Sequence, residues 1–501
     1  MFLFSSSPRL AKERTGLMNF AQLAKLVRKG LPVHTDSRNV KEGDCFVAMP
    51  GTTVRGIDFI PMALYNGASC IVAAEADRDV IGPEVEDKAA VCYVPDTADA
   101  LGELAAEAFG TNDIQMKTVG ITGTNGKTTT SYIVEHLLSA SGLIPGVLGT
   151  VSYRWPGFSV DAKLTTPDCW AIHELMANMG QADVDAVVME VSSHALEQKR
   201  VAGIDFDVAV FTNLTQDHLD YHGSMERYFE SKAKLFTEYP AEGKCCVINH
   251  DDHYGRRLLG MCENVVGYGL GEPVQDIPSL CGRIKESTVK GLVLECSWKG
   301  KSWEIRSPLV GEHNALNLLA AQAVGICLGL GCKDFRKLDE FKGVPGRLER
   351  VENELNLDIF IDYAHTPDAL MNVQKTLKAL DFSRLITVFG CGGDRDRTKR
   401  PLMAEAVARF ADVAVLTSDN PRTEDPEAIM RDAEPGLEGC PHVIREADRT
   451  EGIRKAILEM RDGDVLLIAG KGHESYQEIG TERIDYHDSR AVMAAIAEAK
   501  Q

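Results

Sequence analysis

Hydrophobic residues in this chain gather in short continuous runs rather than in an alternating pattern, and stretches with helical spacing separate the runs. A strand that is covered on both faces needs apolar side chains at successive positions, whereas a strand with one wet face alternates. The pattern therefore predicts parallel sheets with helices on both faces, which is the α/β class.

The runs fall into three blocks, which predict three domains. The expected strands are 45–48 and 70–74 in the first block, 117–121, 186–189, 208–211 and 246–248 in the second, and 359–361, 385–389, 413–416 and 465–469 in the third. A helix is expected over 97–109, and mixed polarity over 281–310 indicates a small antiparallel insert. We expect a small α/β domain over 18–111, a central parallel-sheet domain over 112–342 and a Rossmann-like α/β domain over 343–501. Residues 1–17 have two interpretations, a disordered extension or a start codon placed too far upstream.

Composition and charge narrow the range of functions. The formal net charge of −20 over 501 residues argues against non-specific nucleic-acid binding, which needs a basic surface. No apolar run reaches about 18 residues, so no transmembrane helix is predicted, and the short apolar N-terminus is not a secretory signal. The absence of a CxxC pair indicates neither a zinc site nor a redox motif. We expect a cytoplasmic protein without nucleic-acid partner or membrane insertion.

One strand leads into a glycine-rich turn with the features of a phosphate-binding loop. The strand at 117–121 is followed by Gly-Thr-Asn-Gly-Lys-Thr-Thr and then by a helix. Glycines let backbone N–H groups turn toward phosphates, the lysine reaches the β- and γ-phosphates, and the first threonine can ligate Mg²⁺. The strict Walker A spacing needs glycine at 121, where this chain has isoleucine, but the flanking strand and helix favour ATP binding over a plain glycine-rich turn. The expected ATP-binding residues of the loop are Gly123, Thr124, Asn125, Gly126, Lys127, Thr128 and Thr129.

Two side chains that follow strands of the same block are candidate metal ligands. Glu190 comes directly after the strand at 186–189, and His218 follows the strand at 208–211. Because the carboxyl ends of parallel strands meet at one edge of a sheet, both should lie near the loop. Mg²⁺ favours oxygen ligands and tolerates one imidazole, so we expect Thr128, Glu190 and His218 to hold it. The alternatives are a solvated glutamate and a hydrogen-bonded histidine.

Five motifs in one order resemble those of the Mur ligases of peptidoglycan synthesis. They are Thr122–Thr129, Met189–His194, Thr212–Asp220, His313–Asn317 and Asp362–Asp368, and the match extends from about residue 34 to residue 485. The resemblance implies an ATP-dependent amide-forming ligase that uses Mg²⁺ and activates a carboxylate as an acyl phosphate.

Within this family the motifs are most similar to those of ligases that add meso-diaminopimelate to the D-Glu γ-carboxyl of UDP-MurNAc-L-Ala-D-Glu. By this resemblance Lys127, Glu190, His218 and Lys232 are catalytic, and Lys232 is an N6-carboxylysine. A carbamate turns the lysine cation into an anion that can bridge Mg²⁺. The alternative for Lys232 is an ordinary lysine on a helix surface.

The resemblance also assigns three sets of ligand contacts. The set for UDP-MurNAc-L-Ala-D-Glu is Ser37, Thr52, Thr53 and Val54 for the uridine part and Thr165, Thr166, Ser192, Gln198 and Arg200 for the muramoyl-peptide part. The set for ATP outside the loop is Asn314, Arg347, Asp362 and His365. The set for meso-diaminopimelate is Arg395, Asp419, Asn420, Pro421, Arg422, Gly470 and Glu474. The chain departs from the family pattern at Leu164, where asparagine is frequent.

The tetrad Asp-Asn-Pro-Arg at 419–422 is the most informative about the amino acid, and it resembles the signature of the diaminopimelate-adding ligases. meso-Diaminopimelate has a second carboxylate at its far end, which the Arg422 guanidinium can bind with two hydrogen bonds. L-Lysine has no such carboxylate. A proline turn explains the Asn-Pro pair but not the arginine.

Two other functions compete with this interpretation. A folylpolyglutamate synthetase shares a similar phosphate loop, but it gives no reason for the tetrad at 419–422. A non-catalytic scaffold on the same fold is disfavoured, because Lys127, Glu190, His218 and Lys232 are all present.

Overall fold

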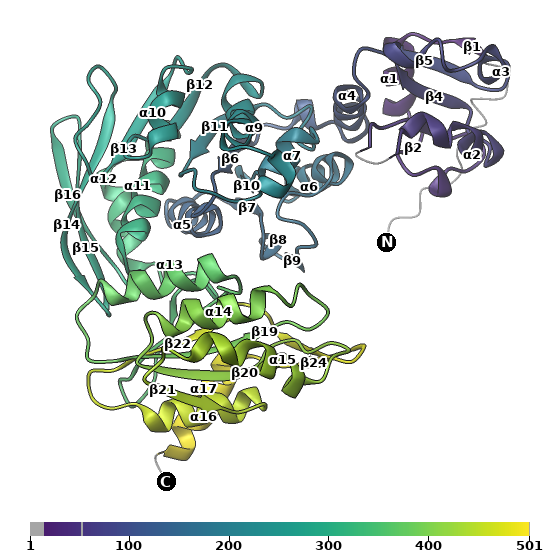
Figure 1. The fold of residues 1–501 in the computed structure, drawn as a ribbon. Helices are drawn as coiled ribbons and strands as arrows, with labels where there is room; N and C mark the ends of the chain where they lie inside the picture. Colours follow the sequence, from purple (N-terminus) through teal and green to yellow (C-terminus); the bar gives the residue numbers. More distant parts are fainter. Residues whose placement is uncertain (1–14, 52–53, 500–501) are drawn as a thin grey trace. The chain divides into compact units, whose positions relative to one another are not determined.

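The structure is a computed structural model that describes residues 15–51 and 54–499 (Figure 1). By its internal contacts the chain divides into two compact units. The first comprises the chain up to Ser131, Gly142–Ile248 and Asp252–Val265, and the second comprises Tyr132–Ser141, Asn249–Asp251 and the chain from Val266 onward. Each of the three predicted blocks contributes its own parallel strands, so the three-domain α/β fold is confirmed. The domain boundaries themselves stay predictions.

The N-terminal block is an all-parallel sheet with the strand order β1-β5-β4-β3-β2. Its strands are β1 (Gly16–Leu17), β2 (Val33–His34), β3 (Cys45–Val47), β4 (Cys70–Ala74) and β5 (Ala90–Val94), and its helices are α1 (Phe20–Arg28), η1 (Ser37–Asn39), η2 (Gly56–Phe59), α2 (Ile60–Tyr65), η3 (Glu75–Asp77), α3 (Pro83–Glu86) and α4 (Thr97–Phe109). Helix α4 has the predicted bounds, because Asp96 caps its first N–H groups and Gly110, in the left-handed region, ends it.

The hypothesis of a disordered extension is wrong for its last two residues. Gly16 and Leu17 pair with Ala90 and Val91 as an edge strand. Two residues are too short for a periodicity to be visible in the sequence, so only the neighbouring strand β5 explains their order. Residues 1–14 lie outside the described part of the chain.

The central block has the strand order β12-β11-β6-β10-β7-β8-β9, and its residues Tyr132–Ser141 and Asn249–Asp251 belong to the second unit. The strands are β6 (Lys117–Thr122), β7 (Pro145–Leu148), β8 (Ser152–Trp155), β9 (Phe158–Asp161), β10 (Ala186–Glu190), β11 (Phe206–Phe211) and β12 (Pro240–Asn249), and the helices are η4 (Thr111–Asp113), α5 (Lys127–Ala140), α6 (Cys169–Gln181), α7 (Ser193–Glu197), α8 (Leu219–His222), α9 (Met225–Thr237) and α10 (His253–Leu259). Strands β7, β10, β6, β11 and β12 are parallel, so their carboxyl ends lie along one edge. A parallel sheet is as predicted, but β7 is not among the predicted strands.

Strand β13 (Val265–Gly269), which belongs to the second unit from Val266 onward, pairs with β14 (Ser279–Thr288) in parallel. Strands β14, β15 (Gly291–Trp298) and β16 (Lys301–Ser307) are antiparallel and form the predicted insert. Helices α11 (Glu312–Cys327), α12 (Cys332–Phe335) and η5 (Arg336–Glu340) follow.

The C-terminal block is a six-stranded sheet with the order β17-β18-β22-β19-β20-β21. Its strands are β17 (Glu349–Arg350), β18 (Asp358–Asp362), β19 (Leu385–Cys391), β20 (Val413–Ser418), β21 (His442–Arg445) and β22 (Val465–Ala469). A separate hairpin follows, made of β23 (Tyr476–Ile479) and β24 (Glu482–Asp485). The helices are α13 (Pro367–Lys378), α14 (Lys399–Ala408), α15 (Pro426–Ala433), η6 (Glu434–Leu437), α16 (Arg449–Glu459) and α17 (Asp488–Ala499).

Helices cover both faces of this sheet, which explains its continuous apolar runs. Along β18, Phe360 packs in a core with α13, α14 and α15, whereas Ile359 and Ile361 pack in a second core with α16 and α17 (Figure 1). Because successive side chains of a strand point to opposite faces, both cores need apolar residues at every position.

Among the described helices, none combines the length and the apolar character that crossing a membrane requires.

Candidate functional site

The phosphate loop lies between β6 and α5. Gly123 has a φ of +149°, and a Cβ on it would come within 1.9 Å of the Thr212 hydroxyl oxygen, so only glycine fits. The segment after β11 braces the loop: Thr124 N–H donates to Asn213 O at 2.9 Å, and Asn125 N–H donates to Asn213 Oδ1 at 3.0 Å. Two neighbouring strand ends therefore shape the loop together.

Two lysines converge on the backbone of the loop. Lys127 Nζ donates to the carbonyl oxygens of Gly123 and Thr124 at 2.9 Å each. Lys232 Nζ, from α9, donates to the same Gly123 oxygen at 2.9 Å and lies 4.7 Å from the centre of the Tyr228 ring. Since Lys232 is 1% exposed, the alternative of a helix-surface lysine is wrong.

Burial, and then the charge of Lys127, hold the pKa of Lys232 well below its usual value. A lowered pKa favours the neutral amine, which is the form of lysine that reacts with CO₂ to give a carbamate. Lys232 is therefore chemically suited to the predicted carboxylation, and the modification itself stays a prediction.

Glu190 ends β10 and is 1% exposed, so the alternative of a solvated glutamate is wrong. Its carboxylate accepts hydrogen bonds from the hydroxyls of Thr128 and Thr150, at 2.9 Å each, and from the Thr150 N–H at 3.0 Å. The Thr150 hydroxyl also lies 3.2 Å from that of Thr165, whereas the preceding Leu164 is 46% exposed. Thr150 was missed in the sequence; its position just after β7, at the same sheet edge, is the signal that could have found it.

The other residues predicted for the muramoyl-peptide part form one hydrogen-bonded cluster beside Glu190. The Thr166 hydroxyl donates to Glu190 O at 2.8 Å and accepts from the Ser192 N–H at 3.0 Å. The Arg200 guanidinium donates to Thr166 O at 3.0 Å and to Gln198 Oε1 at 2.6 and 2.9 Å. The structure thus brings Thr165, Thr166, Ser192, Gln198 and Arg200 together.

His218 lies in the loop after β11 with a φ of +51°, a conformation uncommon for a residue other than glycine. Its ring is about half exposed, with Nε2 3.6 Å from Asp217 Oδ2 and the ring centre 4.9 Å from that of His194. Within the described residues, no three His, Cys, Asp or Glu side chains form a metal-holding group by themselves. A cation here would need oxygen atoms from a hydroxyl or a ligand as well.

The residues predicted for the uridine part lie in the N-terminal block. Ser37 is buried at the start of η1, and its carbonyl oxygen accepts a hydrogen bond from Asn66 Nδ2 at 2.8 Å. Val54 is 52% exposed. Thr52 and Thr53 lie outside the described residues.

The remaining residues predicted for ATP belong to the second unit. Asn314 is buried in α11. The Asp362 carboxylate, at the end of β18, accepts two backbone N–H groups at 2.7 and 2.8 Å, and burial raises its pKa. The Arg347 guanidinium lies 5.1 Å from the centre of the Tyr363 ring, and its buried Nε has no hydrogen-bond partner in the part of the chain that the structure describes.

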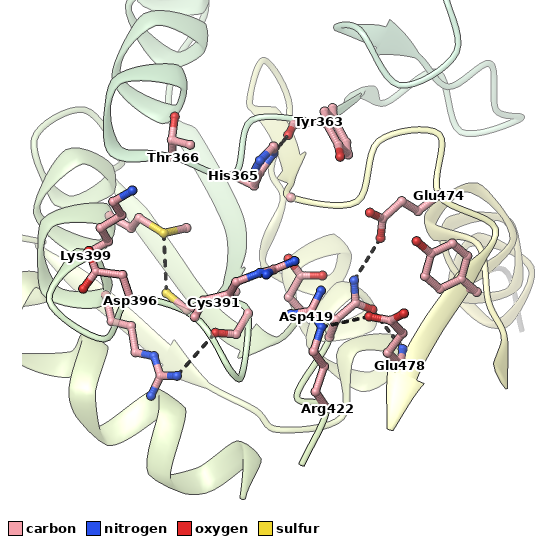
Figure 2. Close-up of a pocket in the computed structure, with 18 of the residues that line it drawn as sticks. Tyr363, His365, Thr366, Cys391, Asp396, Lys399, Asp419, Arg422, Glu474 and Glu478 are labelled. Carbon is pink, nitrogen blue, oxygen red and sulfur yellow. Dashed lines mark hydrogen bonds and ion pairs between the residues drawn. The ribbon is translucent and has the colours of Figure 1, made fainter. Parts of the chain in front are cut away.

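The loops after β18, β19, β20 and β22 line a cavity of about 770 Å³ in the second unit (Figure 2). These four strands are adjacent and parallel, so their carboxyl ends open into one place. The predicted residues that line the cavity are His365, Arg395, Asp419, Asn420, Arg422, Gly470 and Glu474. Pro421 is buried in the same loop.

Arg422 is held in the cavity wall with a φ of +51°. Its guanidinium donates from Nε to Glu478 Oε2 at 2.9 Å and from Nη1 to Gly393 O at 2.8 Å. Figure 2 shows the Arg422 and Glu478 side chains directed at one another. Glu478 comes from the hairpin strand β23, and no motif in the sequence marks it.

Lys471 is a second residue of this site that the sequence motifs do not assign to any ligand. It is fully buried, and its Nζ lies 3.4 Å from Asp419 Oδ1, 2.9 Å from Asn420 Oδ1 and 3.0 Å from Glu474 Oε2. Asn420 Nδ2 donates to the same Glu474 oxygen at 3.0 Å. One buried ammonium thus holds three of the predicted site residues in fixed positions.

Three family models match the chain. The Mur ligase family catalytic domain matches residues 32–109, the Mur ligase middle domain 121–325 and the Mur ligase glutamate ligase domain 346–472. The chain is 49% identical to the UDP-N-acetylmuramoyl-L-alanyl-D-glutamate--2,6-diaminopimelate ligase of Lawsonia intracellularis, over 94% of this chain and 96% of the relative. Its identity to the ligase of the same name from Synechococcus elongatus is 44%, over 93% and 94%.

A solved structure with that same enzyme name is 32% identical and covers 94% of this chain and 95% of its own, with a TM-score of 0.69. The folylpolyglutamate synthase of Mycobacterium tuberculosis is 21% identical over 80% of this chain and 95% of its own, with a TM-score of 0.58, and so shares the fold alone. The family resemblance drawn from the motifs is confirmed. The chain belongs to the Mur ligase family, the ATP-dependent amide-forming ligases.

Proposed function

We propose that this chain adds meso-diaminopimelate to the γ-carboxyl of D-Glu in UDP-MurNAc-L-Ala-D-Glu, as a cytoplasmic step of peptidoglycan precursor synthesis. The observation that carries the proposal is Arg422, whose guanidinium lies in the wall of a cavity built by four strand ends. The names of the relatives support both substrates.

The reaction has two steps, and the chain acts in both by positioning and by charge. The D-Glu γ-carboxylate attacks the ATP γ-phosphorus and ADP leaves, which gives an acyl phosphate. The neutral amine of the amino acid then attacks the acyl carbon, loses a proton, and inorganic phosphate leaves. Lys127 and the loop N–H groups stabilise the charge on the transferred phosphoryl group, and the cluster of Thr166, Ser192 and Arg200 orients the carboxylate.

Mg²⁺ fits the oxygen atoms beside the loop. The neutral oxygen of the Thr128 hydroxyl and an anionic oxygen of the Glu190 carboxylate lie 2.9 Å apart. Mg²⁺ prefers oxygen ligands of these two kinds alongside phosphate oxygens. With His218 they form the predicted ligand set. When bound, the ion supplies positive charge against the phosphates.

Lys232→Met should lower kcat by about 10²-fold, because it removes both the buried amine and the carbamate that would form on it.

The activity of the wild-type enzyme should also fall in buffer stripped of CO₂ and return when bicarbonate is added. The return should be weaker at low pH, because the ammonium form of Lys232 does not react with CO₂. Intact-mass spectrometry would detect the added CO₂, and phosphate release would give kcat.

Lys234→Met is the matched control, since Lys234 is two positions along the same helix and pairs with Glu197 at the surface. Its kcat should stay within about two-fold of wild type. A Lys232→Met enzyme with wild-type kcat would contradict the role of this lysine.

The proposed function is tested with ATP, UDP-MurNAc-L-Ala-D-Glu and an amino acid in one assay of phosphate release. Phosphate release should require meso-diaminopimelate, and L-lysine should replace it poorly. Release that depends on a glutamyl folate instead would support the folylpolyglutamate alternative, and equal use of L-lysine would refute the assignment of Arg422.

Arg422→Ala should raise the KM for meso-diaminopimelate about 10- to 100-fold and leave the KM for ATP unchanged. The loss corresponds to charged hydrogen bonds of about 1.5–3 kcal/mol. Arg431→Ala, an exposed arginine of the same domain, serves as the control. Parallel rises in both KM values would indicate a misfolded domain rather than a lost ligand contact.

A further inference from the structure

Within the first unit, the N-terminal block contacts a short turn of the central block, residues 198–203, which follows α7. Helix α4 lies directly against this turn, because a Cβ on Gly102 would come within 2.5 Å of the Ala202 carbonyl carbon. Ala202 is 3% exposed and packs in the hydrophobic core of the N-terminal block, with Leu101 and Leu104. The two blocks therefore meet backbone to backbone, with no room for a side chain at position 102.

Lys199 ties the same turn to the start of α4. Its ammonium donates to Asp96 Oδ2 at 3.1 Å and to Asp99 Oδ2 at 2.6 Å. Asp96 is the N-cap of α4, and Asp99 lies in the first turn of that helix. Lys199 has a φ of +50°, which is uncommon for a residue other than glycine. One cation of the central block is thus shared by two carboxylates of the N-terminal block.

His173 fastens the contact from its buried side. This residue of α6 is 0% exposed. Its Nε2 lies 3.0 Å from Ala202 O, and its Nδ1 lies 2.7 Å from the Thr111 hydroxyl oxygen. Thr111 begins η4, the connection between the two blocks. The histidine therefore joins the turn to the connecting segment, and both of its ring nitrogens have a partner.

The same turn also carries two residues predicted to bind the muramoyl-peptide part. Gln198 and Arg200 flank Lys199 in the chain. The Arg200 guanidinium donates to Gln198 Oε1 and to Thr166 O, and the Thr166 hydroxyl donates to Glu190 O. Neighbouring residues of one turn thus serve the peptide cluster and the contact with the N-terminal block.

The proposed nucleotide substrate needs both blocks at once, since its uridine part is assigned to the N-terminal block and its D-Glu end to the cluster beside Glu190. A ligand that binds two subsites gains the full affinity of both only if they are held at the separation that it spans. We propose that the turn 198–203 is a rigid joint that holds the two subsites at this separation, with Lys199 as a positioning residue. This inference rests on the proposed function.

The test compares UDP-MurNAc-L-Ala-D-Glu with MurNAc-L-Ala-D-Glu, which lacks the uridine diphosphate and needs only the central block. Mass spectrometry of the products gives kcat/KM for each, and the ratio of the two values measures what the uridine part contributes. Gly102→Ala puts a methyl group where the Ala202 backbone lies, and should lower this ratio at least about 10-fold. Alanine is a strong helix former, so α4 itself should stay folded.

Lys199→Met should lower the same ratio about three-fold, because the ion pairs are partly exposed and the glycine contact remains. Lys199→Arg keeps the charge and should retain most of the wild-type ratio. Lys234→Met is the matched control, since it removes an ion pair of similar exposure, with Glu197, inside the central block. Its ratio should equal that of the wild type.

Gly260→Ala is the control for the added methyl group, because a Cβ on Gly260 would lie 3.7 Å from its nearest neighbour, Arg257 O. It should leave the ratio unchanged. An unchanged ratio in Gly102→Ala, or an equal fall in kcat/KM for both substrates, would overturn the proposal and leave the turn a purely structural role.

Binding of UDP alone separates the joint from the uridine subsite. In Gly102→Ala, calorimetry should give a dissociation constant for UDP within about two-fold of wild type, and at least about a 10-fold rise for UDP-MurNAc-L-Ala-D-Glu. Equal rises for both ligands would show a damaged N-terminal block and would overturn the proposal. If the wild type forms no product with meso-diaminopimelate, the proposed function fails, whereas these two dissociation constants still decide the role of the joint.

Discussion

Replacing Lys127 by methionine should lower kcat by about 10³-fold, the effect expected when a fixed positive charge is removed from a transferring phosphoryl group. The Lys127 ammonium is held by two loop carbonyls at 2.9 Å each, so it is in place before ATP arrives. Methionine keeps the length and apolar stem of the side chain but has no charge. Phosphate release at saturating concentrations of all three substrates would measure the change.

Lys117→Met is the control for this substitution. Lys117 starts the strand that leads into the loop, and its ammonium pairs with Asp207 at the surface. An exposed ion pair contributes little, so kcat should stay within about two-fold of wild type. A Lys127→Met enzyme with more than a tenth of the wild-type kcat would show that the loop lysine does not carry the chemistry.

Asp488→Asn should destabilise the C-terminal domain by about 3–5 kcal/mol, the cost of leaving a buried charge without its partner. The Arg449 guanidinium and the Asp488 carboxylate are both 0% exposed and are joined by bonds of 2.7 and 2.8 Å. Arg449 also donates to the last carbonyls of β20 and β22, Ser418 O at 3.5 Å and Ala469 O at 3.0 Å. Because Asp419 and Gly470 come next in the chain, this ion pair supports the strand ends that build the amino-acid cavity.

Amide hydrogen exchange of β20 and β22, read by mass spectrometry, would measure the loss in the intact chain. Asp485→Asn is the control, since Asp485 pairs with Arg490 at the surface and should cost less than about 1 kcal/mol. Arg449→Met combined with Asp488→Leu should recover much of the stability, because it removes both charges together. Equal exchange in Asp488→Asn and wild type would contradict the assigned role of the pair.

The phosphate loop could be predicted well because all its determinants are local. A strand, two glycines, a lysine and a helix start lie within a short stretch, and the backbone conformation that Gly123 needs is a property of that residue. The departure from strict Walker A spacing at Ile121 did not affect the prediction of the loop, because Ile121 is a buried residue of the strand and not part of the turn.

The roles of Glu190 and Lys232 could be proposed from the family motifs, but their alternatives could be excluded only by burial. Each is 1% exposed, and each depends on side chains or carbonyls from other strands. A sequence shows that a residue follows a strand or lies on a helix. It does not show which face of the helix is covered.

Glu478 and Lys471 show where sequence reasoning ends. Glu478 contacts Arg422 across 56 positions and Lys471 contacts Asp419 across 52, and nothing local in the chain marks either pair. The same holds for β1, whose order comes from its pairing with β5.

The sequence by itself determined the α/β class, the phosphate loop and the family, because apolar periodicity, glycine conformation and motif order are encoded in adjacent residues. Only the tertiary structure decided which groups meet. It buried Lys232 beside the charge of Lys127, which lowers its pKa, and it placed Glu478 on Arg422. Both outcomes depend on desolvation and on distances between charges, which arise only when separate segments pack together.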